Sequence, residues 1–394
     1  MEIDRLISSR ARSVEASGIR EVFKRRATMT DPIDFSIGQP DFAVPSVMKA
    51  AAVRAIEQDK HGYTLTQGIQ PLIESVAHHV ERDLGWPAAH SRESIIITDG
   101  TSGGLHIAML ALLNPGDEII LADPYFVAYP HMARLCGANA VLCDTYPDFK
   151  MTAERVEPLI TARTKAVLFN TPGNPSGAVM SSRECAEMLE LCRRKNVLLI
   201  SDEIYDEFCY SDSAEPMGIG ADPARRRCPS PCRIPGSEDS TLLIRGFGKT
   251  YGCTGWRMGY AIGPRPLIEQ MLKMQQYSFV CAPTPLQWAC VESFGVEMEP
   301  YVRAYEKKRD MVHERLGPLT GMRKPGGAFY AFVPVPKHAA AGGRAFFNAA
   351  AEHKVLIVPG DVFSTRDTHF RISFACKDET LDRGLSVLER LLRG

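Results

Sequence analysis

The feature that most constrains this chain is the alternation of short β-rich apolar runs with longer amphipathic stretches through its first 285 residues. A short apolar run bounded by turn residues is typical of a strand that is buried on both faces. An amphipathic stretch such as SSRECAEMLELCRRK is typical of a helix that covers a sheet. The alternation therefore predicts an α/β fold with a mostly parallel central sheet between layers of helices. Six strands are expected, at residues 94–98, 118–122, 165–169, 196–200, 241–244 and 259–263.

The pattern changes after about Pro285, where long helical periodicities are followed by short strands around GAFYAFVPV and FRISFA. This change predicts a second, smaller α+β domain over residues 286–394, after a large domain over residues 46–285. Residues 1–45 have no sheet pattern of their own. We expect this N-terminal segment to pack against the small domain and the partner subunit.

Composition excludes several classes of function. A formal net charge of -1 and a pI near 6.8 leave no basic stripe for nucleic acid, so no nucleic-acid partner is expected. No segment reaches the roughly 18 apolar residues of a membrane span, and the first 18 residues alternate charged with apolar side chains, unlike a signal peptide. The eleven cysteines are scattered through core-like segments, which favours reduced thiols and a cytoplasmic location.

One segment, residues 211–240, is rich in Pro, Gly, Ser and Arg and has little periodicity. It is longer than a usual connection between elements. Its Cys228 and Cys232 could bind a metal or pair, but a lone C-x3-C lacks the second ligand pair of a zinc site. We therefore expect a solvated loop with two incidental thiols, and no metal.

Ligands of an open parallel sheet bind at the carboxyl ends of the strands, so the residues directly after the apolar runs are informative. DGTSGG, residues 99–104, follows the first run and leads into a helical pattern. Its backbone N–H groups and the hydroxyls of Thr101 and Ser102 could hold an anion. Small residues also cap helices for structural reasons, so this signal is weak by itself.

Three further strand ends carry polar or aromatic side chains. Phe126 follows the second run, Asn174 lies in NTPGNPSG after the third, and Asp202 opens the DEIYDEF stretch after the fourth. A carboxylate at that position is costly to bury unless it meets a cation or a protonated nitrogen. Tyr205 lies three residues further on. Each of these residues alone has an ordinary structural explanation.

The fifth strand end, RGFGKTYGCTGWRMGY, places an amine, Lys249, directly after Gly-Phe-Gly, with Arg257 eight residues later. Together, the residues at these strand ends could bind a phosphorylated aromatic aldehyde. They supply an amine, a carboxylate, an amide, a phenol, a flat ring and an anion cradle. Lys249 would condense with the aldehyde, and Arg257 would reach the phosphate. The glycines would let the backbone turn and approach closely.

In this order and spacing, the motifs resemble the class I/II aminotransferase family, which are fold type I pyridoxal-phosphate enzymes. The matching segments are YTLTQGIQPL, NPGDEIILADPYFVAYP, NTPGNPSGAV, SDEIYDEF, GKTYGCTGWRMGYAIG and FRISFA, and the resemblance covers nearly the whole chain. It implies a large pyridoxal-phosphate domain, a homodimer with shared active sites, and transfer of an amino group from an L-amino acid to a 2-oxo acid by a ping-pong mechanism.

The resemblance also implies roles for individual residues. Lys249 would form the Schiff base and move the proton, while Asp202 would keep the pyridine nitrogen protonated. Tyr205 and Asn174 would hydrogen-bond the phenolic oxygen of the cofactor, and Phe126 would stack on its ring. The phosphate would be bound by Gly100, Thr101, Ser102, Arg257 and Tyr63 of the partner subunit, and the substrate carboxylate by Arg371, Asn174 and Gly38.

The sequence departs from the family pattern near the lysine. Gly246 and Gly248 stand where many members carry serine, so we expect one phosphate contact to be lost. Phe126 stands where tryptophan or tyrosine is frequent, and the segment 211–240 is longer than usual. None of these differences removes a residue that the chemistry requires.

The sequence leaves the substrate open. In FRISF, Phe370 and Ile372 share one face of a strand and Arg371 lies on the other, where an exposed arginine is the ordinary explanation. As a carboxylate clamp, Arg371 would select only the α-carboxylate that all amino acids share. Arg20 lies in a segment that borders the substrate pocket in relatives, but an exposed helical arginine fits the pattern equally well.

Two other functions use similar residues. A β-eliminating C–S lyase has the same fold and the same carbanion, but NTPGNPSG is the form of that turn common in transaminases. A non-enzymatic cofactor-binding regulator would carry an additional DNA-binding domain, for which the sequence offers neither a basic surface nor a spare helix-turn-helix segment.

Overall fold

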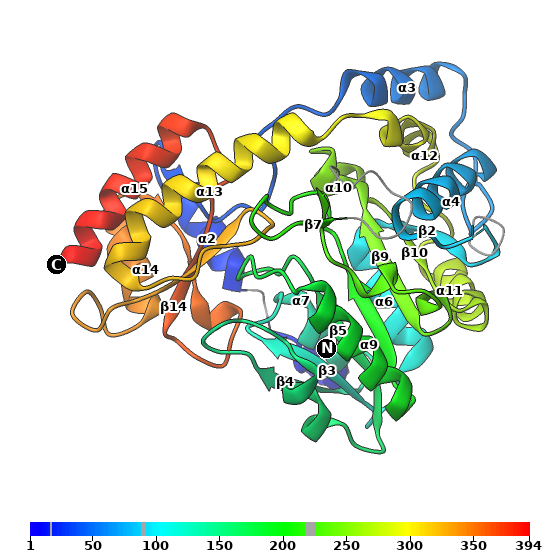
Figure 1. Ribbon diagram of the computed structural model, residues 1–394, viewed down its shortest axis with the longest axis horizontal. Coiled ribbons are helices and arrows are strands. Elements are labelled where there is room, and N and C mark those ends of the chain that lie inside the picture. Colours follow the sequence, from blue (N-terminus) through cyan, green and yellow to red (C-terminus); the bar gives the residue numbers. More distant parts are fainter. Residues whose placement is uncertain (16–17, 88–91, 217–225) are drawn as a thin grey trace.

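The computed structural model describes residues 1–15, 18–87, 92–216 and 226–394 (Figure 1). A seven-stranded sheet forms the centre of its larger part, and every neighbouring pair is parallel except those of β10, which runs antiparallel to β2 and β9. The predicted mostly parallel sheet is therefore confirmed. In spatial order the strands are β2 (Ile95–Asp99), β10 (Met258–Ile262), β9 (Thr241–Gly246), β6 (Leu198–Asp202), β5 (Thr164–Asn170), β3 (Glu118–Asp123) and β4 (Asn139–Asp144).

All six predicted strands are present, and their ends differ from the prediction by two residues at most. The edge strand β4 was not predicted. Its residues 140–143, AVLC, form an apolar run, but only Cys143 of β4 is fully buried, because the strand lies at the edge of the sheet.

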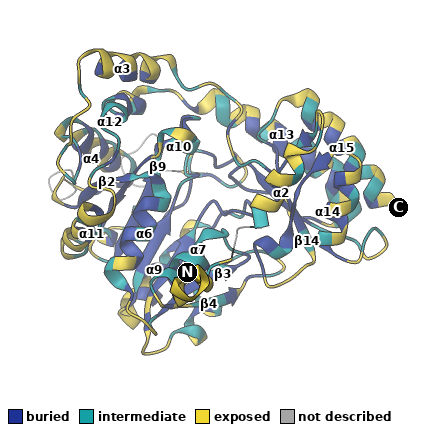
Figure 2. Cartoon of the chain, turned by 180° about the vertical axis from the view of Figure 1, so that it is seen from behind, coloured by how far each residue is buried: buried dark blue, intermediate teal, exposed yellow. Residues whose placement is uncertain are grey.

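Helices cover both faces of the seven-stranded sheet. Alternate residues of β2 point into different cores: Ile96 packs with α6 and α11, whereas Ile95 and Ile97 pack with α4. The helix α9 begins with a capping box formed by Ser181 and Glu184, as its sequence favours. Figure 2 shows the strands between these layers buried, whereas α3 is largely exposed. The helices of this part are α3 (Ser46–Glu57), α4 (Gln70–Leu84), α6 (Gly100–Leu112), α7 (Ala128–Leu135), α8 (Ala153–Val156), α9 (Ser182–Lys195), α10 (Phe247–Thr250), α11 (Arg265–Ser278) and α12 (Thr284–Val291).

The smaller part is built on a three-stranded sheet of β11 (Tyr330–Pro334), β14 (His369–Ser373) and β13 (Val358–Pro359). Figure 1 shows it at the opposite end of the molecule from α4 and α11. The N-terminal segment joins it: β1 (Ile33–Asp34) pairs with β12 (Val355–Leu356), and Phe35 lies in the same core. Its helices are α13 (Glu299–Thr320), α14 (Gly343–Glu352) and α15 (Asp378–Arg393), and the N-terminal ones are α1 (Ser9–Arg12) and α2 (Gly18–Ala27). Domain boundaries near residues 45 and 285 remain our proposal, and the second of them falls inside α12, which packs against α3 and α4 of the larger part.

The expectation of a solvated loop over residues 211–240 is wrong for residues 228–232, while residues 217–225 lie outside the described chain. Cys228 and Cys232 are 4% and 0% exposed. The segment is held by Arg233, which donates to Asp83, and by Ser230, which donates to Glu203. Such contacts between distant polar residues leave no periodicity in the sequence, so composition alone gave the wrong expectation.

The described ranges show neither a metal-binding cluster nor a membrane-spanning helix. They contain no group of three or more His, Cys, Asp or Glu side chains that could hold a metal ion. No helix in them combines the length and the apolar character needed to cross a lipid bilayer.

Arg245, at 2% exposed, is the centre of a buried ion network. It donates to Glu203 at 2.8 Å and 3.1 Å and to Asp83 at 2.8 Å. We expect Arg245→Met to lower the free energy of unfolding by about 3–5 kcal/mol, because buried carboxylates lose their counter-charge. Arg265→Met, at an exposed ion pair of α11, should cost less than about 1 kcal/mol. Urea denaturation of both variants checks this, and equal losses would contradict it.

Candidate active site

A cavity of about 220 Å³ that opens to solvent lies at the carboxyl ends of the central strands, where the smaller part meets the sheet. The structure brings together in its lining every residue predicted from the sequence except Tyr63. These residues are Gly38, Gly100, Thr101, Ser102, Phe126, Asn174, Asp202, Tyr205, Lys249, Arg257 and Arg371.

Lys249 lies in the short helix α10, directly after β9, and its Nζ donates a hydrogen bond to the backbone oxygen of Gly38. Burial, followed by the nearby charges of Arg371 and Arg257, lowers the pKa of the amine to about 8. A substantial fraction of this lysine is therefore neutral near pH 7–8 and can act as a nucleophile or a base.

Close contacts explain two of the glycines near Lys249. A Cβ on Gly246 would lie 2.8 Å from Ile204 Cδ1 and 3.0 Å from Thr101 Cγ2. A Cβ on Gly38 would lie 2.1 Å from the hydroxyl of Tyr330. The serine common at position 246 in the family therefore does not fit here without movement of its neighbours.

Asp202 ends β6 at the bottom of the pocket and is 3% exposed. Its Oδ2 accepts a hydrogen bond of 2.7 Å from the hydroxyl of Tyr129, and its Oδ1 accepts one of 3.2 Å from the backbone of Ile204. Burial nevertheless raises the pKa of the carboxyl group to about 6. No described cationic side chain forms an ion pair with it, so a protonated ring nitrogen is the kind of ligand that would stabilise its charge.

The first turn of α6 forms an anion cradle. Gly100 has φ +69°, and a Cβ there would lie 2.6 Å from Nη2 of Arg257. The guanidinium of Arg257 is held beside this turn by the backbone oxygens of Thr254 and Asp99, at 3.2 Å and 3.4 Å. Free N–H groups at a helix start, the helix dipole and an arginine together favour a phosphate.

Arg371 is buried, at 2% exposed, so the explanation of an exposed arginine is wrong. It donates to Asn174 Oδ1 at 3.1 Å and to the backbone oxygen of Ser36 at 2.7 Å. Its guanidinium lies against the rings of Tyr330 and Phe363, and Nε has no partner among the described residues. Burying a guanidinium without a carboxylate partner costs free energy of desolvation, and a bound carboxylate would offset that cost.

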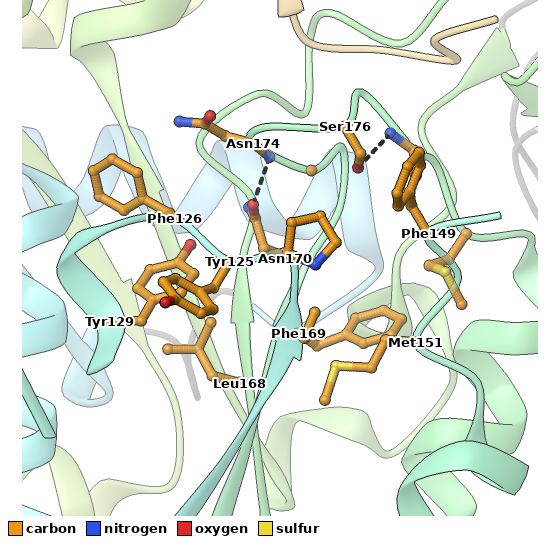
Figure 3. Close-up of a pocket in the computed structure, with 15 residues that line it drawn as sticks. Tyr125, Phe126, Tyr129, Phe149, Met151, Leu168, Phe169, Asn170, Asn174 and Ser176 are labelled. Atoms are coloured by element: carbon orange, nitrogen blue, oxygen red, sulfur yellow. Dashed lines mark hydrogen bonds between the residues drawn. The ribbon is translucent and has the colours of Figure 1, made fainter. Parts of the chain in front are cut away.

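Three residues at the site were missed in the sequence. The hydroxyl of Tyr330 lies 3.0 Å from that of Tyr205. Asn170 donates to the backbone oxygen of Asp202. It also accepts from the backbone of Asn174, a hydrogen bond that Figure 3 shows. Tyr129 could have been found one helical turn after Phe126, and Asn170 directly before the TPGNPSG turn. Tyr330 is carried by β11 of the smaller part, and no local signal marks it.

Tyr63 is 90% exposed and is absent from the described lining of this chain's own pocket. Its loop is held against α11 and α12, because Gln275 donates to the backbone of Thr66 and Thr284 to that of Gly62. The residue is therefore presented outward, on the surface of the larger part.

Comparison with known proteins agrees with this site. The model of the family "aminotransferase class I and II" matches residues 30–388. The aspartate aminotransferase of Pyrococcus abyssi is 30% identical over 398 residues, covering 98% of both chains. The aromatic-amino-acid aminotransferase 2 of Thermococcus litoralis is also 30% identical, with 98% of both chains covered.

Solved structures are similar over the same length. The aspartate aminotransferase of Thermotoga maritima has a TM-score of 0.90 at 30% identity, covering 98% of this chain and 100% of its own. That of Thermus thermophilus with maleate has a TM-score of 0.87 at 31% identity, covering 98% and 99%. This fold is that of pyridoxal-phosphate-dependent enzymes. The chain belongs to the aminotransferase class I and II family. It is an aminotransferase, acting on amino acids and 2-oxo acids.

Proposed function

We propose that this enzyme transfers the amino group by a ping-pong mechanism in which Lys249 is the catalytic amine. The observation that carries the proposal is the environment of Lys249. Its amine has a pKa of about 8 and lies in one pocket with the buried carboxylate of Asp202 and the buried guanidinium of Arg371. Donor and acceptor would occupy this pocket in turn.

The residues fit pyridoxal 5′-phosphate. When bound, this cofactor supplies an aldehyde that condenses with amines and an electron-poor ring that acidifies the substrate Cα–H. The raised pKa of Asp202 is a reason to expect a cationic partner, which the protonated ring nitrogen would provide. The remaining contacts that we propose are Gly100, Thr101, Ser102 and Arg257 to the phosphate, Phe126 to the ring face, and Asn174 and Tyr205 to the phenolic oxygen.

The chain's own groups then have distinct tasks in the reaction. Arg371 binds the α-carboxylate through its fork of donors, while Asn174 and the backbone of Ser36 hold the guanidinium in place. Near the Gly38 backbone, Lys249 Nζ would take the proton from the substrate Cα as general base and, as general acid, would deliver it to the carbon that carried the cofactor's aldehyde. A pKa near 8 allows the Lys249 amine both to accept and to donate a proton at neutral pH.

We propose a homodimer in which Tyr63 of the partner subunit completes the phosphate site. The loop of Tyr63 lies against α11, and large apolar side chains are exposed on both: Tyr63 at 90%, Leu65 at 78% and Tyr277 at 87%. Phe279, which is 41% exposed, extends this apolar surface to the start of α6. Its ring would lie 3.9 Å from a Cβ placed on Gly103, in the first turn of that helix. An apolar surface beside a phosphate cradle favours a second copy of the chain as its cover.

We propose a cytoplasmic location. All eleven cysteines lie in the described part of the chain and all are free. Reduced thiols in this number favour a reducing compartment.

The test is a half-reaction. Purified enzyme loaded with pyridoxal phosphate is mixed with a panel of L-amino acids without any oxo acid, and its visible spectrum and products are recorded. We expect one equivalent of the matching 2-oxo acid per site, together with conversion of the cofactor from its aldehyde to its amine form. Catalytic release of pyruvate and ammonia from cysteine-like substrates, with the yellow band retained, would instead identify a β-eliminating lyase.

Removing the carboxylate clamp should affect mainly substrate binding. We expect Arg371→Leu to cost about 2–5 kcal/mol in kcat/KM, seen chiefly as a KM raised at least about 30-fold. Arg371→Lys keeps the positive charge but loses the forked pair of donors, so its kcat/KM should lie between those of Arg371→Leu and the wild type. The thermal midpoint should not fall much in Arg371→Leu, because a buried charge without a carboxylate partner has been removed. An unchanged KM would contradict the assignment.

A further inference from the structure

The charges in the pocket limit which substrates it can hold. In the described lining, four side chains carry charge: Asp202, Lys249, Arg257 and Arg371. The proposed function employs all four, for the cofactor, the reacting amine and the α-carboxylate. In the described lining that this chain supplies, no cation is therefore left to pair with a second, distal carboxylate. The Tyr63 loop that we propose reaches in from the partner subunit, residues 62–66, carries no charged side chain either.

The wall beside the substrate position is apolar. The backbone oxygens of Ser36 and Gly38 contact Arg371 and Lys249, so the segment 36–38 runs between the groups that hold the α-carboxylate and the Cα. The hydroxyl of Ser36 is directed to Asp34 instead, at 2.6 Å. Ile37 is the remaining side chain that this segment contributes to the pocket.

The helix α2 contributes Ile19 and Phe23 to the same lining. Its basic side chains are directed elsewhere. Arg25 donates to Asn348, and Arg26 pairs with Asp34 at 3.1 Å. Arg20, which the sequence left as a candidate for a distal carboxylate, is exposed and is not part of the described lining.

We propose that the amino donor is an L-amino acid with an uncharged, apolar side chain, of the leucine, methionine or phenylalanine type, and that Ile19, Phe23 and Ile37 select it. This inference rests on the proposed function and adds its substrate class. A carboxylate placed among these three side chains would lose its hydration without gaining a counter-charge. Apolar side chains gain contact area at the same place, and each methylene group changes kcat/KM by about tenfold or more.

The first experiment compares donors in the half-reaction of the wild-type holoenzyme. We expect kcat/KM for leucine, methionine or phenylalanine to exceed that for aspartate and glutamate by at least about tenfold. If aspartate or glutamate reacts as fast or faster, the inference is overturned while amino transfer stands. If no amino acid yields a 2-oxo acid, the proposed function itself fails.

The second experiment uses two variants of Phe23, which is 44% exposed and so tolerates a polar replacement. Phe23→Arg adds a cation, and Phe23→Gln is the matched uncharged control. The ratio of aspartate to phenylalanine kcat/KM is measured within each preparation, so that cofactor loading cancels. We expect Phe23→Arg to raise this ratio at least about fivefold above that of Phe23→Gln. Equal ratios in the two variants would overturn the specificity role of Phe23.

Discussion

Replacing Lys249 with alanine is expected to abolish repeated turnover, with kcat lowered by at least about 10⁴-fold. The change removes both the amine that holds the cofactor and the base that moves the Cα proton. No other lysine lines the described pocket, so no neighbouring amine can take over. Steady-state transamination with the best donor measures the loss.

The matched control is Lys195→Ala, at an exposed lysine of α9 that pairs with Glu157 and lies outside the pocket lining. It should keep the wild-type rate. Borohydride reduction followed by peptide mass mapping should attach the cofactor to the Lys249 peptide in the wild type and in this control. Multiple turnover at the wild-type rate in Lys249→Ala would refute the proposed mechanism.

The second large effect is expected from Asp202→Asn, which should lower kcat by about 10²–10³-fold. Asparagine keeps the size of the side chain and can accept from the hydroxyl of Tyr129, but it carries no charge to hold a proton on the ring nitrogen. The ring then withdraws electrons less strongly, and the Cα proton is less acidic. Single-turnover rates at saturating donor measure this step directly.

Tyr129→Phe separates the charge of Asp202 from its orientation. It keeps the carboxylate and removes one hydrogen bond that lowers its pKa, so its effect should be about tenfold or less. If Asp202→Asn were no slower than Tyr129→Phe, the charge of Asp202 would not contribute as we propose.

Much of the fold could be predicted from the sequence, because buried parallel strands leave continuous apolar runs. The antiparallel direction of β10 could not be predicted, because the periodicity of a strand carries no information on its direction. The edge strand β4 could have been predicted as well, since its residues 140–143, AVLC, form such a run. The buried segment 228–232 was missed because ionic contacts, rather than apolar periodicity, hold it in place.

The residues that follow the strands, such as Lys249 and Asp202, could be predicted because a parallel sheet brings its carboxyl ends together. Tyr330 could not, since it comes from the sheet of the smaller part. Substrate class depends on which face of α2 meets the pocket. The sequence offered Arg20 for that face, whereas the structure has Ile19 and Phe23 there.

The most direct test of the central claim follows the nitrogen atom. The enzyme is supplied with a ¹⁵N-labelled amino acid and an unlabelled 2-oxo acid of a different side chain, and the products are analysed by mass spectrometry. The account predicts that the new amino acid carries the ¹⁵N and that the donor appears as its 2-oxo acid in equal amount. Recovery of the label as ammonia, without a labelled amino acid, would contradict it.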